Sequence, residues 1–149
     1  MKIHNKPKKR FGQNFLQDEN ILNKIVKEIN PQPDDLIIEI GPGYGAFTQK
    51  LLTATPNLIA VEIDNELANT LREKFPHLHL VNEDFLETDL SKLTSQVKKL
   101  RVVGNIPYNI TSPILFKLIE NNKLMKDSVF MVQLEVAQRM TEKKGTKDY

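Results

Sequence analysis

The sequence contains no cysteine, no tryptophan and only three histidines among its 149 residues. The absence of cysteine excludes disulfide bonds, a cysteine nucleophile and thiolate sites for zinc or iron–sulfur clusters. The three histidines offer few ligands, so we expect no metal. No apolar run reaches the roughly 18–20 residues that a membrane-spanning helix requires, and no signal peptide opens the chain. These absences favour a cytoplasmic protein without a membrane partner.

The basic residues are concentrated at one end of the chain. Residues 1–10 hold five of the 21 lysines and arginines and no acid, so the rest of the chain carries 16 bases against 19 acids. Such an arm contacts nucleic acid, because each cation neutralises a phosphate and releases counterions, or it is a solvated terminus. The sequence FGQNFL at 11–16 follows it directly and favours the first interpretation. The candidates for RNA contact are Lys8, Lys9, Arg10 and Phe11.

From Asp18 onward, short apolar runs alternate with amphipathic stretches. The predicted strands are residues 36–40, 58–63, 78–81, 101–104 and 128–133. The first predicted helix runs from an Asp18 N-cap to Asn30, and the second passes through Phe47 to Leu52. Further helices are predicted over 65–74, weakly over 91–97, and over 134–143. Between the last two, a helix begins at a Ser112 N-cap and is expected to bury Ile114, Leu115, Leu118 and Ile119. Strands separated by helices predict an α/β fold with a doubly wound, mainly parallel sheet, whose ligands bind beyond the carboxyl ends of the strands.

The first predicted strand ends in a glycine-rich turn, EIGPGYG at 39–45. Glycines at i, i+2 and i+4 allow a tight turn and a close approach to a ligand. The spacing is not a dinucleotide fingerprint, which needs its third glycine at i+5, and Ala46-Phe47 stands where a Walker A loop has Gly-Lys. An ordinary tight turn remains an alternative, but Glu39 just before the glycines favours a cofactor loop that includes Gly41 and Gly43.

Carboxylates follow the next two strands. Glu62 lies 21 residues beyond Gly41, where a doubly wound fold places an acid against both hydroxyls of a ribose. Asp64 fits a helix N-cap better. Asp84 is suited to accept from an adenine amino group with Phe85 stacking nearby, although a solvated loop acid is the simpler interpretation of Asp84 alone. Together they predict a ribonucleoside site without phosphates, since no lysine or arginine converges there, and S-adenosylmethionine fits it better than ATP or NAD.

After the fourth strand comes the hexapeptide GNIPYN at 104–109. The side-chain oxygen of Asn105 and the carbonyl of Ile106 are suited to accept the two N–H bonds of an aromatic amine, Pro107 fixes the turn, and Tyr108 offers a face for a base. The target base has to be flipped out or unpaired to reach them. The simpler alternative is a proline turn before a helix, with Tyr108 in the packing.

With these residues in view, the chain resembles the ribosomal RNA adenine N6,N6-dimethyltransferases of the small (16S) subunit, class I methyltransferases that use S-adenosylmethionine. The matching stretches are residues 9–16, 39–43, 62–64, Asp84, 104–110 and 132–139. The resemblance implies that Asn14, Leu16, Gly41, Glu62, Asp84 and Asn105 contact S-adenosylmethionine, that Asn105 through Tyr108 hold the target adenine, and that Arg139 lies in a family stretch suited to RNA.

The same resemblance implies two methyl transfers to each of two adjacent adenines near the 3′ end of 16S rRNA within an assembling 30S-type particle, with S-adenosylhomocysteine as product. We expect a monomer. Family members continue beyond the point that matches Tyr149, and the apolar run VFMV at 129–132 suits an interior strand. We therefore expect residues 1–17 to form a basic arm that contacts cofactor and RNA, and residues 18–149 to be the N-terminal part of a methyltransferase domain that is truncated after its fifth strand and following helix.

Two rival functions remain. The sister group that methylates large-subunit rRNA and confers macrolide resistance shares the Gln-Asn-Phe and Asn-Ile-Pro-Tyr elements, but the Gly-Pro-Gly turn and the run QLEVA at 133–137 favour the small-subunit family. A non-catalytic RNA-binding assembly module is a different class, and the intact Asn105–Tyr108 segment argues against it. A nicotinamide dehydrogenase is disfavoured by the glycine spacing.

Overall fold

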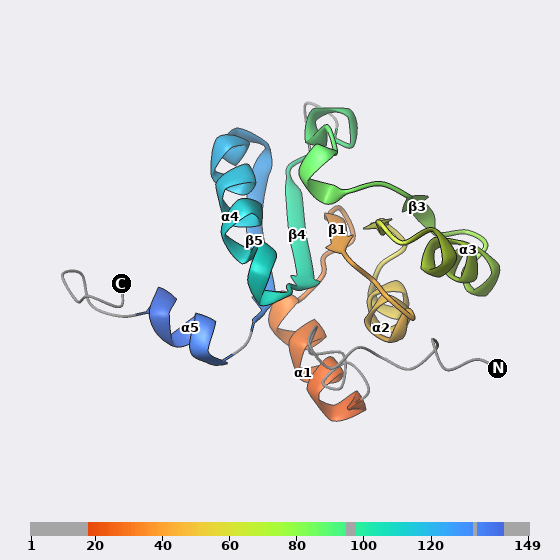
Figure 1. The fold of residues 1–149 in the computed structure, drawn as a ribbon. Helices are drawn as coiled ribbons and strands as arrows, with labels where there is room; N and C mark the ends of the chain where they lie inside the picture. Colours follow the sequence, from red (N-terminus) through yellow and green to blue (C-terminus); the bar gives the residue numbers. More distant parts are fainter. Residues whose placement is uncertain (1–17, 95–97, 133, 142–149) are drawn as a thin grey trace.

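The computed structural model describes residues 18–94, 98–132 and 134–141, and within them five strands form one parallel sheet (Figure 1). The strands are β1 (Leu36–Ile40), β2 (Leu58–Val61), β3 (His79–Val81), β4 (Leu100–Asn105) and β5 (Met125–Met131). The α-helices are α1 (Glu19–Ile29), α2 (Ala46–Ala54), α3 (Asn65–Lys74), α4 (Thr111–Glu120) and α5 (Leu134–Met140). Short 3₁₀ turns are η4 (Phe85–Glu87), η5 (Leu90–Lys92), η6 (Tyr108–Ile110) and η7 (Asn122–Leu124). None of the helices in these ranges has the length and apolarity needed to cross a bilayer.

Local sequence signals explain where α1 begins and ends. The carboxylate of Asp18 accepts the N–H groups of Asn20 and Ile21 at 2.9 and 3.3 Å, which satisfies donors that the first helical turn leaves unpaired. The helix ends at Asn30, which has a φ of 49°, a left-handed conformation that asparagine tolerates better than most residues. Both predicted limits of this helix are confirmed.

Helices cover both faces of the sheet, as a parallel sheet requires. On one face α1 and α2 bury a cluster of apolar side chains against the strands: Leu22, Ile29, Ile37, Phe47, Leu51, Leu58 and Val103. On the other face α4, η4 and η5 bury a second cluster against the strands, which includes Ile38, Ile59, Phe85, Leu90, Val102, Ile106, Ile114 and Leu118. The predicted α/β class and parallel sheet are confirmed.

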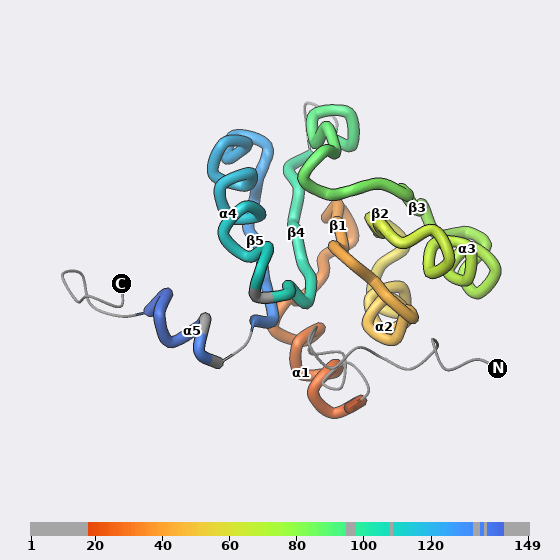
Figure 2. The backbone as a smooth tube through the Cα atoms, in the orientation of Figure 1, coloured from red at the N-terminus to blue at the C-terminus, as the bar shows by residue number. Residues whose placement is uncertain are grey.

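The strand order is β3-β2-β1-β4-β5. The chain moves outward from β1 through β2 to β3 and then returns past β1 to add β4 and β5 (Figure 2). The carboxyl ends of β1 and β4 therefore lie side by side while their following loops diverge, which creates a crevice at this point. A Cβ on Gly104 would lie 2.8 Å from the carbonyl oxygen of Ile40, so glycine permits the close approach of the two strands.

A charged cluster stabilises the opposite, amino end of the sheet. Arg101, at the start of β4, donates to the carboxylate of Asp35 at 2.7 Å and to both oxygens of Asp127 at 2.8 and 3.0 Å. It also donates to the carbonyls of Ile29 and Asn30, the last groups of α1. The buried arginine thus ties the end of α1 to β4 and β5.

Several predicted limits of the elements are wrong. β2 ends at Val61 instead of residue 63, because the Glu62 carboxylate turns back onto the N–H of Asp64 and leaves Ile63 64% exposed. β5 begins at Met125 and ends at Met131, whereas the prediction was 128–133, and in the described sheet it pairs only with β4. The weak helix predicted over 91–97 is only the short η5 turn at its described start, and residues 95–97 lie outside the described part.

Two predictions about α4 are also wrong. The hydroxyl of Thr111 donates to the carbonyl of Pro107 at 3.1 Å, so the helix follows directly from η6, and Ser112 lies inside the first turn instead of capping it. Ile119, which was predicted to be buried, is 65% exposed. The helix predicted over 134–143 begins as expected at Leu134, and its last predicted residues lie outside the described part.

Candidate active site

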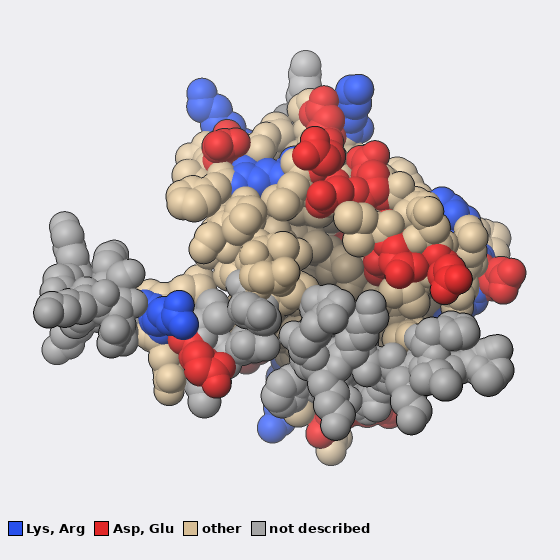
Figure 3. Space-filling view, viewed as in Figure 1, with Lys and Arg blue, Asp and Glu red and all other residues tan. Residues whose placement is uncertain are grey.

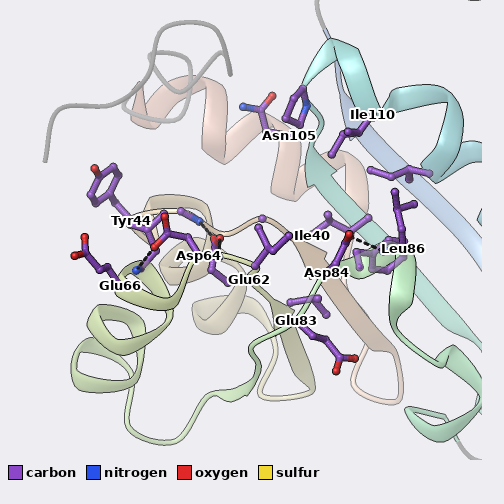
Figure 4. A pocket seen from close by; sticks show the side chains of 18 of the residues that line it. Ile40, Tyr44, Glu62, Asp64, Glu66, Glu83, Asp84, Leu86, Asn105 and Ile110 are labelled. Atoms are coloured by element: carbon purple, nitrogen blue, oxygen red, sulfur yellow. Dashed lines mark hydrogen bonds between the residues drawn. The ribbon is translucent and has the colours of Figure 1, made fainter. Parts of the chain in front are cut away.

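A pocket of about 640 Å³ opens at the carboxyl ends of β1, β2 and β4. This is the edge of the sheet at which the sequence predicted ligand binding. Figure 4 shows Asn105 and Ile110 on one side of the pocket and Glu62, Glu83 and Asp84 on the other. The side chains come from loops that follow four different strands, so no short stretch of sequence forms the site by itself.

The glycine-rich turn after β1 forms the floor beside the β2 loop. Gly41 has a φ of +64° and nothing within 4 Å of its missing Cβ, so the backbone is open toward the pocket. Gly45 has a φ of +90°, and a Cβ there would lie 2.7 Å from the Phe75 ring. The first glycine exposes the backbone to a ligand, and the third lets the turn pack against α3.

Glu62 joins the two loops. Its Oε1 accepts the N–H of Gly43 and its Oε2 accepts the N–H of Asp64, each at 3.0 Å. The side chain is buried, and this burial raises the pKa of Glu62 despite the two backbone donors, with the nearby Asp64 charge acting in the same direction. Asp64 itself accepts the N–H of Leu67 at 3.0 Å, which confirms its predicted role as the N-cap of α3.

Glu39 lies behind the turn and outside the pocket lining. It is fully buried, and the hydroxyl of Thr48 donates to it at 2.6 Å. Burial raises the pKa of Glu39 to about 8, and the negative charge of Glu62 contributes in the same direction, whereas the Thr48 hydrogen bond opposes the shift. Glu39 therefore connects β1 to the first turn of α2 through Thr48, and its raised pKa favours the protonated form.

Asp84 and Phe85 lie on the wall opposite the glycine turn, at the start of η4. The Asp84 Oδ1 accepts the N–H of Leu86 at 2.9 Å, which orients the carboxylate at the pocket edge. Phe85 is 5% exposed, so its ring belongs to the core beneath α4 as well as to the pocket wall. Asp84 and Phe85 line the same pocket, and their contacts with a nucleobase stay predictions.

The segment after β4 borders the other side of the pocket. Asn105 is the last residue of β4 and, like Pro107, lines the pocket. The N–H of Ile106 donates to the carbonyl of Met131 at 3.0 Å, and the carbonyl of Pro107 accepts from Ile110 and Thr111. These contacts hold the segment between β5 and the start of α4. The side chain of Tyr108 lies outside the described part, so its stacking role stays a prediction.

The lining is acidic. It contains five carboxylates and, among the described residues that line it, no lysine or arginine: the acids are Glu62, Asp64, Glu66, Glu83 and Asp84. Figure 3 shows acidic side chains on two sides of the hollow on this face. An acidic pocket without cations suits a neutral or cationic nucleoside and repels phosphates. The described side chains form no cluster of three or more histidine, aspartate or glutamate residues that could hold a metal ion.

The structure brings together Gly41, Gly43, Glu62, Asp84, Phe85, Asn105 and Pro107 around one pocket, with Ile106 buried directly behind it. Arg139 is exposed on α5 and does not line the pocket. The remaining predicted contacts lie outside the described residues: Lys8, Lys9, Arg10, Phe11, Asn14 and Leu16.

Sequence reasoning missed several residues of the site. Asn109, the last residue of the hexapeptide, and Ile110, directly after it, line the pocket, and neither was assigned a role. Asn82 donates to the carbonyl of Glu62 at 2.9 Å and so fixes the end of β2 from the loop after β3. Its place beside Asp84 was a usable signal, because an amide at the end of a strand is suited to bind the neighbouring backbone. No sequence signal pairs Thr48 with Glu39.

Comparisons with known proteins agree with this geometry. A profile described as "Ribosomal RNA adenine dimethylase" matches residues 4–149. A curated relative, "Ribosomal RNA small subunit methyltransferase A" from Chlorobium phaeobacteroides, is 53% identical over 142 residues, which are 95% of this chain and 52% of the relative. The chain spans about half the length of the curated relatives it matches.

Two solved structures have the same fold. A dimethyladenosine transferase from Plasmodium falciparum superposes with a TM-score of 0.73 at 31% identity, over 89% of this chain and 48% of that one. The 23S rRNA methyltransferase ErmE superposes with a TM-score of 0.71 at 32% identity, over 83% of this chain and 50% of that one. The parallel sheet with its acidic pocket is thus the fold of class I methyltransferases, and the chain belongs to the ribosomal RNA adenine dimethylase family.

Proposed function

We propose that the protein transfers methyl groups from S-adenosylmethionine to the exocyclic amines of two adjacent adenines near the 3′ end of small-subunit ribosomal RNA. One observation carries the proposal: a single pocket combines an acidic nucleoside wall at the ends of β1–β3 with the Asn105–Pro107 segment at the end of β4. In this proposal residues 18–149 are the N-terminal part of a methyltransferase domain, and residues 1–17 form an arm that contacts cofactor and RNA.

The nucleoside wall fits S-adenosylmethionine in size and charge. A pocket of about 640 Å³ lies within the usual range of roughly 300–1,000 Å³ for small ligands. Glu62 is placed to accept the ribose hydroxyls, and Asp84 to accept the adenine amino group. Gly41 lets the methionine part approach the backbone, and the lack of cations in the lining disfavours ATP or NAD.

When bound, the cofactor supplies an electrophilic methyl group on a sulfonium. The residues of this chain then have to position a weak aromatic amine. The Asn105 side-chain oxygen and the Ile106 carbonyl accept its two N–H bonds, which directs the nitrogen lone pair toward the methyl group. The contact of Ile106 N–H with Met131 and the contacts of the Pro107 carbonyl with α4 keep these acceptors in place. The expected rate enhancement comes from orientation and from stabilisation of the positive charge that develops on the nitrogen.

The proposed setting is an assembling small ribosomal subunit in the cytoplasm, with the enzyme acting as a monomer and without a metal. Curated relatives named for the small ribosomal subunit support the choice of RNA. The chemistry requires no strong base, because the amine loses its proton after the methyl group has been transferred. The positioned acceptors suffice for such a step.

A methyl-transfer assay tests the proposal. Purified protein is incubated with labelled S-adenosylmethionine and with small or large ribosomal subunits that lack the adenine modification. We expect label in dimethyladenosine of the small-subunit RNA. Label only in the large subunit would instead support the activity named for ErmE, and cofactor binding without transfer to either subunit would support an assembly module.

A further inference from the structure

Lys117 lies on α4 outside the pocket lining, but its ammonium group reaches the back of the nucleoside wall. Its Nζ donates to the carbonyl of Leu86 at 3.0 Å and to the carbonyl of Thr88 at 2.6 Å. The same nitrogen lies 5.6 Å from the centroid of the Phe85 ring, within the range of a cation–π contact. One side chain thus contacts three residues of the segment that carries Asp84: Phe85, Leu86 and Thr88.

That segment, residues 84–88, is a closed turn around Asp84. The N–H of Leu86 donates to the Asp84 carboxylate at 2.9 Å, and the hydroxyl of Thr88 donates to the Asp84 carbonyl at 3.0 Å. The carbonyls that Lys117 holds belong to the same residues, Leu86 and Thr88. A movement of the turn would therefore move the Asp84 carboxylate, and Lys117 restrains that movement.

The helix that carries Lys117 also supports the target side of the pocket. Thr111, in the first turn of α4, donates to the carbonyl of Pro107, directly after Asn105 and Ile106. About two helical turns later, Lys117 binds the turn of residues 84–88. α4 thereby connects the wall proposed for the adenine of the cofactor with the wall proposed for the adenine of the RNA.

An ordinary solvated lysine would not show these contacts. Lys117 is half-buried and forms no ion pair with a carboxylate in the described part of the chain, and its ammonium donates to two backbone carbonyls. Lys123, in η7, is an exposed lysine and serves as a comparison. Partial removal of an ammonium group from water costs free energy unless its N–H groups find acceptors. The acceptors of Lys117 are carbonyls of the pocket wall, so the same hydrogen bonds hold that wall in place.

We propose that Lys117 is a positioning residue for adenine recognition: it holds residues 84–88 so that Asp84 accepts the amino group of the cofactor's adenine. This inference rests on the proposed function, since it assumes that an adenine binds at Asp84. It predicts a loss of selectivity for adenine when the Lys117 ammonium is removed, beyond any general loss of affinity.

Calorimetric titration with S-adenosylhomocysteine and S-inosylhomocysteine, which has a carbonyl in place of the adenine amino group, tests the inference. The wild-type protein is expected to prefer the adenine form by roughly tenfold or more, because a carboxylate accepts from the amino group and repels the carbonyl. Lys117→Met should reduce that ratio to within about threefold, and Lys117→Arg, which keeps the donors, should restore most of it. The matched control Lys123→Met should keep the wild-type ratio.

The inference would be overturned if Lys117→Met kept the wild-type ratio of the two affinities while Asp84→Asn abolished the preference for the adenine form. If Lys117→Met does not fold, Lys117→Gln serves in its place, because it keeps a single donor group and should give an intermediate ratio. In the Asp84→Asn background, Lys117→Met should produce no further change in the ratio, since both act through one contact. Failure of the proposed cofactor site, on which this inference rests, looks different: the wild-type protein would bind neither ligand.

Discussion

Both ends of the sheet bury carboxylates, but the pKa values of these groups shift in opposite directions. At the amino end, burial would raise the pKa of Asp35, but hydrogen bonds from Gln32, Arg101 and Lys126 outweigh it and hold the pKa below its usual value. At the carboxyl end, burial raises the pKa of both Glu39 and Glu62, and no cation lies close enough to form an ion pair with either in the described part of the chain.

This difference separates a structural site from a functional one. The carboxylates at the amino end are compensated inside the folded chain, so they need no further partner. At the carboxyl end Glu62 lines a pocket and Glu39 lies outside its lining, and in the described part of the chain backbone N–H groups and a hydroxyl, not cations, donate to them. Buried acids that have raised pKa values and no cationic partner are typical of binding and catalytic sites. The comparison predicts that substitutions at the amino end change stability and that substitutions at the carboxyl end change binding or turnover.

The largest expected effect is on stability, from Arg101→Met. Removal of the guanidinium leaves Asp35, 4% exposed, without its closest cation and leaves the last carbonyls of α1 without a donor. We expect the free energy of unfolding in urea to fall by about 3–5 kcal/mol. Lys126→Met is the control: Lys126 binds the same carboxylate but is 53% exposed, so its loss should cost about 1 kcal/mol or less. Equal losses in the two variants would contradict the assigned roles.

Asn105→Ala is expected to have the largest effect on turnover. Without the side-chain oxygen, one acceptor for the amine is missing, and the rate of methyl transfer should fall by about 10²–10³. The free energy of unfolding should change by less than about 1 kcal/mol, because Asn105 is only half-buried. Asn122→Ala, in the exposed η7 turn, should transfer methyl groups at the wild-type rate. Near-normal transfer by Asn105→Ala would remove that residue from the mechanism.

Much of the site was predictable because each strand end carries its own signal. The glycines of 41–45, the acids Glu62 and Asp84 and the hexapeptide segment are local in sequence, and the parallel topology alone brings them to one edge. The contacts between segments were not predictable. Arg101 and Asp35 are 66 positions apart, and Lys117 contacts residues about 30 positions away, so nothing in the local pattern of either partner indicates the pair.

The errors in the predicted elements have a similar origin. The run at 58–63 is apolar apart from Glu62, but the strand ends at Val61, where the Glu62 carboxylate accepts the N–H groups of Asp64 and Gly43. Ser112 is a good N-cap in isolation, but the helix begins one residue earlier at Thr111, with Ile110 at the N-cap position and no side-chain cap. Ile119 follows Leu115 by four residues, but it is out of period with the buried Ile114 and Leu118, so it lies on the exposed side of α4.

A smaller effect is expected for Glu62→Gln, which keeps the size of the side chain and removes its charge. The KM for S-adenosylmethionine should rise by roughly 10–100-fold, because a hydrogen bond that involves a charged group is lost, and kcat should change much less. Glu66→Gln is a matched control on the same pocket wall, since Glu66 is exposed, and its KM should stay within about threefold of wild type. A fall in kcat at unchanged KM would mean that Glu62 acts in the chemical step instead.

A last prediction distinguishes the two ends by the sign of a pH dependence. Because the folded pKa of Glu39 is raised from 4.5 to about 8, its contribution to stability is present below pH 4.5 and is lost as the pH rises to about 8. Relative to Glu39→Gln, wild-type stability should therefore fall as the pH rises across this window. Asp35, with its lowered pKa, should show the opposite sign and lose its contribution as the pH falls into the acid range.

Urea unfolding at several pH values measures both slopes. Glu28→Gln, an exposed acid on α1, provides the reference for a carboxyl that is not buried. A wild-type stability that runs parallel to that of Glu39→Gln between pH 5 and 8 would show that Glu39 is already ionised in the folded protein.

The central claim is that the uncompensated carboxylates at the carboxyl end of the sheet form a site for a nucleoside without phosphates. Calorimetric titration of the purified protein with S-adenosylmethionine and, separately, with ATP tests it most directly. The pocket predicts one molecule of S-adenosylmethionine bound per chain, with affinity weakened by Glu62→Gln, and no measurable heat from ATP. Saturable binding of ATP with no binding of S-adenosylmethionine would contradict the account.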